Sequence, residues 1–127
     1  KEVVAGTLDM VGLSDSGKKK AGSLSGGQMR LLEIARTLKA GKGLFLLDEP
    51  TAGVSPKMTG QVADIIKELK RSGKTVLIIE HDLPFIGSIC DEVVVLDVGK
   101  VVLQGTPAEV KESKELKEIY FGADPTT

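Results

Sequence analysis

The chain has 127 residues, of which 41% are hydrophobic and 28% are charged, so it can bury the core of one domain. Its formal net charge of -1 gives no electrostatic case for binding nucleic acid. The single Cys90 excludes an internal disulfide, and one cysteine with one histidine argues against a zinc site. The sequence begins with Lys1 instead of Met, inside a predicted helix, and we therefore expect a fragment boundary there.

The first third of the chain predicts two helices joined by a polar loop. Apolar residues recur at helical spacing up to about residue 12, which predicts the end of an amphipathic helix. Ser25 is a good N-cap, and Gln28 completes a Ser-x-x-Gln capping box that begins the second helix. We expect Gly41 to end this helix as a C-terminal glycine does.

The middle of the chain predicts a strand, a helix and a second strand. Leu44–Leu47 is a continuous apolar run that is typical of a strand buried on both faces of a parallel sheet. Ser55 and Pro56 begin the helix, Gly73 ends it, and Thr75–Ile79 forms the second strand. Because such βαβ units make parallel strands, the carboxyl ends of both strands are expected at one edge.

The last third predicts a short helix over Leu83–Ile89 and then a hairpin. Its strands are Val93–Leu96 and Val101–Gln104, on either side of a turn that contains glycine. Thr106 is followed by Pro and, three positions after Thr106, by Glu, which predicts another helix start. A last helical segment is expected to end near Phe121.

Ser25, Gly26, Gly27 and Gln28 form a candidate anion site at the start of the second helix. The first turn of a helix has free backbone N–H groups and the positive end of the dipole, and glycines let a phosphate come close. A capped helix with a glycine-rich entry would use the same residues. The four residues alone leave these two interpretations about equal.

Asp48 and Glu49 follow the first buried strand, at the edge where open α/β sheets bind ligands. Asp48 could hold Mg²⁺ through water, and Glu49 could orient or deprotonate an attacking water. His81 follows the second strand, on the edge expected to hold Glu49, where it could contact a γ-phosphate. The alternatives are an acidic turn before Pro50 and a structural histidine.

No phosphate loop is found in the sequence. Residues 12–19 match Gly-x4-Gly-Lys but have Lys where Ser or Thr must reach Mg²⁺, and they follow a helix instead of a strand. Gly73-Lys74-Thr75 has the right ending, but Glu68 stands where the first Gly belongs.

The motifs, in this order, resemble the ATPase domain of ATP-binding cassette (ABC) proteins. Residues 24–28 are similar to its signature motif, 44–49 to its Walker B motif, and His81 to its switch histidine. The resemblance implies an α/β fold: a partial P-loop NTPase (RecA-like) core with parallel strands, a C-terminal β-hairpin and the end of the ABC helical subdomain. The resemblance divides residues 1–127 into three parts. Residues 1–40 are the end of the helical subdomain, residues 41–122 are the core, and residues 123–127 are a tail.

The resemblance also implies ligands and roles. ATP and Mg²⁺ are the expected cofactors, with Asp48 as the metal residue and with Glu49 and His81 as catalytic residues. Ser25 to Gln28 would act in trans on the nucleotide of a second ABC ATPase domain, paired head to tail as a homo- or heterodimer. The implied D-loop consists of Ala52, Gly53, Val54 and Ser55. Ser55 stands where most members carry the Asp that makes the usual cross-dimer contact.

Within the family the chain looks closest to ATPases of branched-chain amino-acid importers, on the segments Thr51–Pro56, Glu80–Asp82, Gly105–Pro107 and Tyr120–Gly122. Transmembrane permease subunits and a peripheral position on the cytoplasmic face of the cell membrane are then expected. A non-transport ABC ATPase and a non-catalytic half-domain that lends its signature motif are the alternatives. Because the phosphate loop is absent, we expect the 127-residue chain alone to be inactive.

Overall fold

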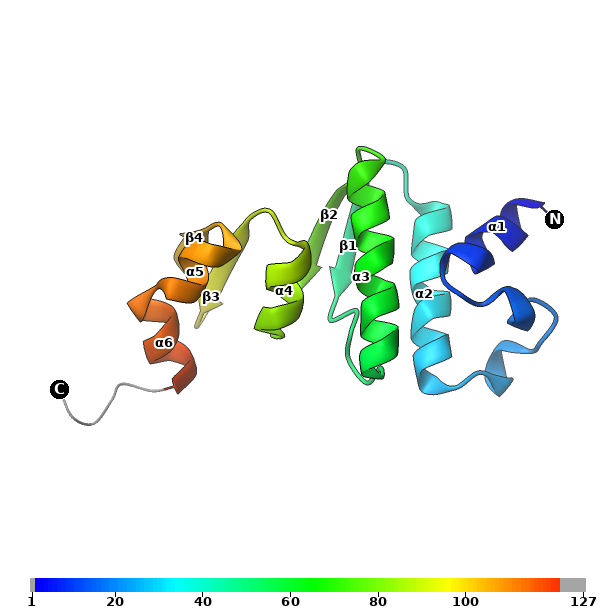
Figure 1. The fold of residues 1–127 in the computed structure, drawn as a ribbon, viewed down its shortest axis with the longest axis horizontal. Coiled ribbons are helices and arrows are strands. Elements are labelled where there is room, and N and C mark those ends of the chain that lie inside the picture. The colour runs from blue at the N-terminus through cyan, green and yellow to red at the C-terminus, as the bar shows by residue number, and fades with distance from the viewer. Residues whose placement is uncertain (1, 122–127) are drawn as a thin grey trace. The chain divides into compact units, whose positions relative to one another are not determined.

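The computed structural model describes residues 2–121 and the side chains of residues 2–119. The chain divides into two compact units, residues 1–81 and residues 82–127. The first unit contains α1 (Glu2–Met10), the 3₁₀ turns η1 (Ser14–Ser16) and η2 (Ala21–Ser23), α2 (Gly26–Ala40), β1 (Leu44–Asp48), α3 (Pro56–Arg71) and β2 (Thr75–Ile79) (Figure 1). The second contains α4 (Leu83–Ile89), β3 (Val93–Asp97), β4 (Lys100–Gly105), α5 (Pro107–Glu112) and α6 (Lys114–Phe121). Within the described residues, no helix has the length and apolar character needed to cross a membrane.

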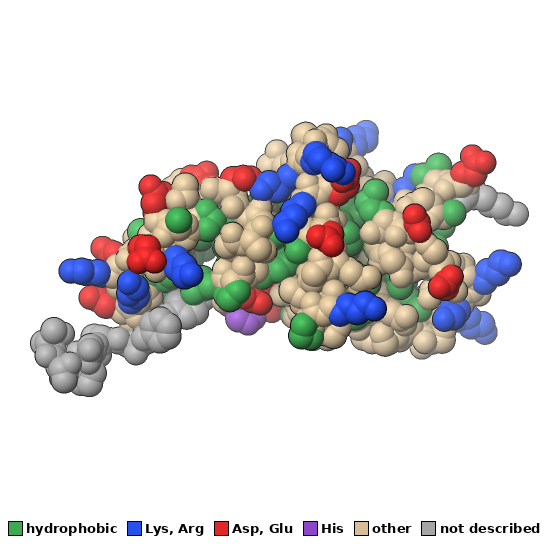
Figure 2. Space-filling model, viewed as in Figure 1, with side chains coloured by type: hydrophobic (Ala, Val, Ile, Leu, Met, Phe, Trp, Pro, Cys, Tyr) green, Lys and Arg blue, Asp and Glu red, His purple; other side chains and the backbone are tan. Residues whose placement is uncertain are grey.

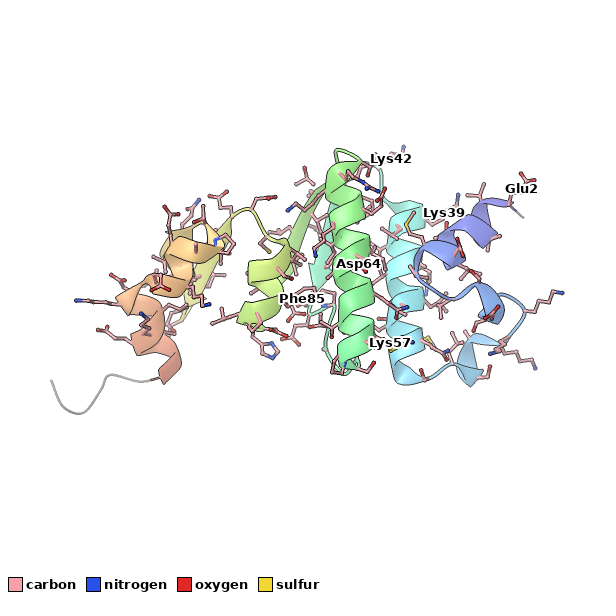
Figure 3. The ribbon with its side chains drawn as sticks, viewed as in Figure 1. Glu2, Lys39, Lys42, Lys57, Asp64 and Phe85 are labelled. Carbon is pink, nitrogen blue, oxygen red and sulfur yellow. The ribbon has the colours of Figure 1, made fainter. Side chains whose placement is uncertain are left out.

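The predicted βαβ unit is confirmed. β1 and β2 pair in parallel and in register, from Leu44 opposite Thr75 to Asp48 opposite Ile79. The carboxyl ends of the two strands therefore lie side by side. α3 joins them and buries a stripe on its inner face, formed by Val62, Ala63, Ile65, Ile66 and Leu69. Lys57 and Asp64 are on its exposed side (Figure 3).

The apolar run of the first strand suits burial on both faces, but β1 is buried on one face only. Phe45 and Leu47 are buried, but Leu44 and Leu46 are 57% and 64% exposed. Successive side chains of a strand point to opposite faces, and the described part of the chain covers only one of them. Leu77 and Ile79 of β2 are also exposed, so the open face of the sheet is apolar.

The two glycines that were expected to end helices behave differently. Gly73 has a positive φ of 78° after α3, and Lys74 N–H donates to the Leu69 carbonyl oxygen at 3.0 Å, as in a Schellman motif. Gly41 ends α2 as expected, but its backbone is extended and not in the left-handed conformation usual for a C-terminal glycine. A β carbon at Gly41 would lie 2.4 Å from the ring of Phe45, and glycine is required there by packing.

In the second unit the hairpin is confirmed, with an antiparallel pair of β3 and β4. Its turn places both Val98 and Gly99 at positive φ, at 44° and 75°. The helix start at Thr106 is confirmed, and the segment from there to Phe121 forms two helices, α5 and α6. Ser113 has extended backbone after α5, and its hydroxyl accepts a hydrogen bond from Leu116 N–H at 3.1 Å. The expected tail at residues 123–127 lies outside the described residues.

Candidate active site

The start of α2 has the predicted capping box. The Ser25 hydroxyl accepts from Gln28 N–H at 3.2 Å, and the Gln28 side-chain oxygen accepts from Ser25 N–H at 3.0 Å. These two bonds fix the first turn, whose remaining N–H groups have no partner within a helix. The arrangement keeps a rigid set of backbone donors at the surface.

The two glycines of this turn differ in their surroundings. A β carbon at Gly27 would lie 2.4 Å from the Met58 sulfur, so close packing of α2 on the start of α3 accounts for that glycine. A β carbon at Gly26 would meet nothing within 4 Å. Packing inside the chain therefore gives no reason for glycine at position 26, and the space beside it is open to a ligand.

The acid pair lies where β1 ends. Asp48 is the last residue of the strand and is exposed. Glu49 N–H donates to the Ile79 carbonyl oxygen at 2.8 Å, and Glu49 has a positive φ of 44°. That conformation is uncommon for a residue other than glycine. Arg30 of α2 donates a hydrogen bond to the Glu49 carbonyl oxygen at 3.2 Å and so holds this peptide from a second element.

His81 lies beside Glu49, as the sequence predicts. Its Nδ1 is 3.5 Å from Glu49 Oε1, and the two side chains are 75% and 50% exposed. The only histidine of the sequence appears in purple at the surface in Figure 2. An imidazole and a carboxylate in this position can contact one small ligand together.

Asp48 is the one residue of the site with a predicted metal role. Across residues 2–121, no group of three or more His, Cys, Asp or Glu side chains is placed to hold a metal ion. Mg²⁺ is commonly bound by one or two carboxylates together with substrate phosphates and water, so a single exposed aspartate fits that ion. It does not fit a metal that needs a complete set of protein ligands.

The predicted D-loop is a tight turn between β1 and α3. Ala52 N–H donates to the Glu49 carbonyl oxygen at 3.0 Å, and Gly53 has a positive φ of 69°. The Ser55 hydroxyl accepts from Met58 N–H at 3.4 Å and caps α3. Ser55 thus has a structural role within this chain.

Sequence reasoning gave no role to Glu80 or Thr51. The Glu80 side chain is only 1% exposed, and its Oε1 accepts hydrogen bonds from the Thr51 N–H and hydroxyl. The available signal was its position, because Glu80 is a carboxylate directly before the candidate histidine and directly after the second predicted strand.

Comparison with known proteins supports the family. The family model described as ABC transporter matches residues 1–52. The branched-chain amino acid transport ATP-binding protein BraF of Pseudomonas aeruginosa is 37% identical over 122 residues, which cover 95% of this chain and 48% of BraF. The L-cystine import ATP-binding protein TcyN of Bacillus subtilis is 38% identical over 108 residues, which cover 85% of this chain and 42% of TcyN.

A solved structure shares the fold. The ADP conformation of MJ1267, an ATP-binding cassette of an ABC transporter, matches with a TM-score of 0.84 and 36% identity, over 96% of this chain and 50% of MJ1267. The chain spans about half the length of the relatives it matches. Sequence, motif order and fold agree, and the chain belongs to the family of ABC transporter ATP-binding proteins.

Proposed function

We propose that this chain supplies the signature motif and the water-activating residues of an ATP-hydrolysing ABC transporter subunit that powers import of a small solute. The observation that carries the proposal is the 3.5 Å approach of His81 Nδ1 to Glu49 Oε1 at the shared end of β1 and β2. Glu49 orients and deprotonates the attacking water, and His81 donates to the oxygens of the terminal phosphate. Mg²⁺, when bound at Asp48, would neutralise charge on the phosphates.

The first turn of α2 would serve a different nucleotide. A β carbon at Gly26 would meet nothing within 4 Å, and an anion at a helix start is stabilised by the dipole. We assign Ser25 to Gln28 to the ATP bound by a second ABC ATPase domain, arranged head to tail. The turn from Ala52 to Ser55 would line the same interface. Transmembrane permease subunits would complete the transporter, with the ATPase on the cytoplasmic face of the membrane.

A chimera tests this proposal. The part of BraF that this chain does not cover is joined to the chain, so that a phosphate loop is present. We expect Mg²⁺-dependent ATP hydrolysis, and we expect Glu49→Gln to lower kcat by about 10²–10⁴-fold while ATP binding persists. Glu112→Gln, at an exposed position of α5, is the matched control. If the chimera hydrolyses ATP equally well with Glu49→Gln, Glu49 is not the general base, and the chain only lends its signature motif. The unfused chain is expected to give no measurable hydrolysis.

We propose branched-chain amino acids as the transported solute, on the match to BraF over 95% of the chain. The L-cystine protein TcyN is as similar in identity but over 85% of the chain. The chimera should restore leucine uptake, and not cystine uptake, in cells that lack their own ATP-binding subunit. Restoration of cystine uptake alone would contradict the assignment.

A further inference from the structure

Glu80 is the most deeply buried carboxylate near the candidate site. Its side chain is 1% exposed, whereas the neighbouring Glu49 and His81 side chains are 50% and 75% exposed. A buried carboxylate is stable only when hydrogen bonds replace its lost hydration. The structure supplies three donors. Thr51 N–H lies 3.0 Å from Oε1, the Thr51 hydroxyl binds the same oxygen, and His81 N–H lies 3.2 Å from Oε2.

These bonds begin where the pairing of the two strands stops. The last backbone bond at this edge joins Glu49 N–H to the Ile79 carbonyl oxygen. Glu80 is the next residue after Ile79, and its side chain continues the connection between the two segments. It accepts hydrogen bonds from Thr51, which lies beyond the end of β1, and from His81, which lies beyond the end of β2. Because donors from both segments bind the two oxygens of one buried carboxylate, these hydrogen bonds hold the two segments in one arrangement.

We propose that Glu80 is a positioning residue for the pair of Glu49 and His81. By fixing the His81 peptide and the Thr51 peptide to one carboxylate, it keeps the imidazole 3.5 Å from Glu49 Oε1. Thr51 also opens the turn to Ser55, so the same carboxylate sets the start of the predicted D-loop. We call the hydrogen bonds from Thr51 and from the His81 N–H to the Glu80 carboxylate the Glu80 clamp. The catalytic role of the clamp rests on the proposed function, whereas its hydrogen bonds are a property of the chain.

The chemistry of the clamp indicates which substitutions break it. Glu80→Gln keeps the shape but has one acceptor oxygen, so an amide N–H₂ group must face either Thr51 or the His81 N–H. Thr51→Val removes the hydroxyl donor at constant shape, and Thr51→Ser keeps it. Glu68→Gln, on α3, removes a negative charge without touching the clamp.

Nuclear magnetic resonance on the 127-residue chain tests the proposal directly, because the sequence contains one histidine and its imidazole signals are unambiguous. We expect Glu80→Gln and Thr51→Val to shift those signals and to speed amide exchange at Thr51 by about tenfold. Exchange at Leu46 and Leu77 should stay unchanged, and Thr51→Ser and Glu68→Gln should resemble the parent chain. Unchanged imidazole signals in both disruptive variants, or equal acceleration at all amides, would overturn the positioning role.

A kinetic measurement in the BraF chimera separates this inference from the proposed function. Thr51→Val should lower kcat by about 10–100-fold while KM for ATP stays constant, because misplacement of catalytic groups acts on the chemical step. Thr51→Ser should restore kcat. An unchanged kcat with Thr51→Val, in a chimera that Glu49→Gln inactivates, overturns the inference alone. A chimera that Glu49→Gln does not inactivate refutes the proposed function, and the resonance test of the clamp still decides the inference.

Discussion

His81 Nδ1 lies 3.5 Å from Glu49 Oε1, although each residue belongs to a different strand end. The in-register pairing of β1 and β2 brings the two ends together, and the bond from Glu49 N–H to the Ile79 carbonyl oxygen extends that pairing. Both side chains remain largely in solvent. The site is therefore built on the sheet without being part of the core that stabilises it.

Removal of the imidazole should leave folding almost unchanged. We expect His81→Ala to alter the free energy of unfolding by less than about 0.5 kcal/mol, as is usual for exposed positions. Ile66→Ala, at a residue 1% exposed in α3, should cost about 2–5 kcal/mol. Urea denaturation followed by circular dichroism measures both. A loss for His81→Ala as large as that for Ile66→Ala would show that the imidazole is a packing residue.

Alanine substitutions at the two glycines of α2 should distinguish a glycine required for packing from a glycine that leaves space for a ligand. In Gly27→Ala the added methyl group would lie 2.4 Å from the Met58 sulfur, so this flexible side chain must move. Gly26→Ala meets no neighbour and gains helix propensity. We expect Gly27→Ala to be less stable than Gly26→Ala by about 1 kcal/mol in urea denaturation.

The comparison has an internal control. Met58→Ala should remove the stability difference between the two alanine variants, because it removes the sulfur. In the BraF chimera, Gly26→Ala should weaken ATP-dependent dimerisation although folding is intact. Equal stability of the two variants in the parent chain would contradict the packing role assigned to Gly27.

The open face of the sheet should cause self-association. Leu44, Leu46, Leu77 and Ile79 are 57–64% exposed, and contiguous apolar surface of this kind associates in water. We expect sedimentation velocity to detect concentration-dependent association of the chain. The double variant Leu46→Lys with Leu77→Glu should reduce it, since these residues are paired across the strands and the new charges attract each other.

The control for this experiment is Val3→Lys with Val4→Glu on α1, where the two valines are 60% and 58% exposed. It changes the same number of exposed apolar residues outside the sheet. A monomeric parent chain at all concentrations, or an equal effect of the control variant, would contradict association through the sheet face.

Glu109 should make the stability of α5 depend on pH. Its carboxylate accepts from the Thr106 N–H at 2.8 Å and from the Thr106 hydroxyl at 2.8 Å, and these bonds lower the pKa of Glu109 below its ordinary value of 4.5, the backbone bond most. Because the pKa is lowered by folding, the stabilisation is present above pH 4.5 and is lost as the pH falls through the folded pKa.

The measurement compares thermal unfolding of the parent chain and Glu109→Gln between pH 7 and pH 3. The parent chain should be the more stable at pH 7, and the difference should shrink steadily below pH 4.5. Glu112→Gln controls for loss of a negative charge on the same helix. A difference that grows in acid would mean that the capping box does not act through the ionised carboxylate.

The sequence by itself determined the elements whose cause is local. The starts of α2, α3 and α5 follow from caps at Ser25, Ser55 and Thr106, because each cap bonds to an N–H group three residues further on. The strands could be predicted from short apolar runs. The sequence did not locate the break at Ser113, because its serine cap stands inside a continuous polar segment without glycine or proline.

Only the tertiary structure decided what depends on residues far apart in the chain. Strand order and register set the approach of His81 to Glu49, and the same pairing buries the Glu80 carboxylate under Thr51. The sequence placed these residues at strand ends but could not give their distances. The sequence also could not show which face of β1 stays exposed, because an apolar strand has the same sequence whichever face another layer covers.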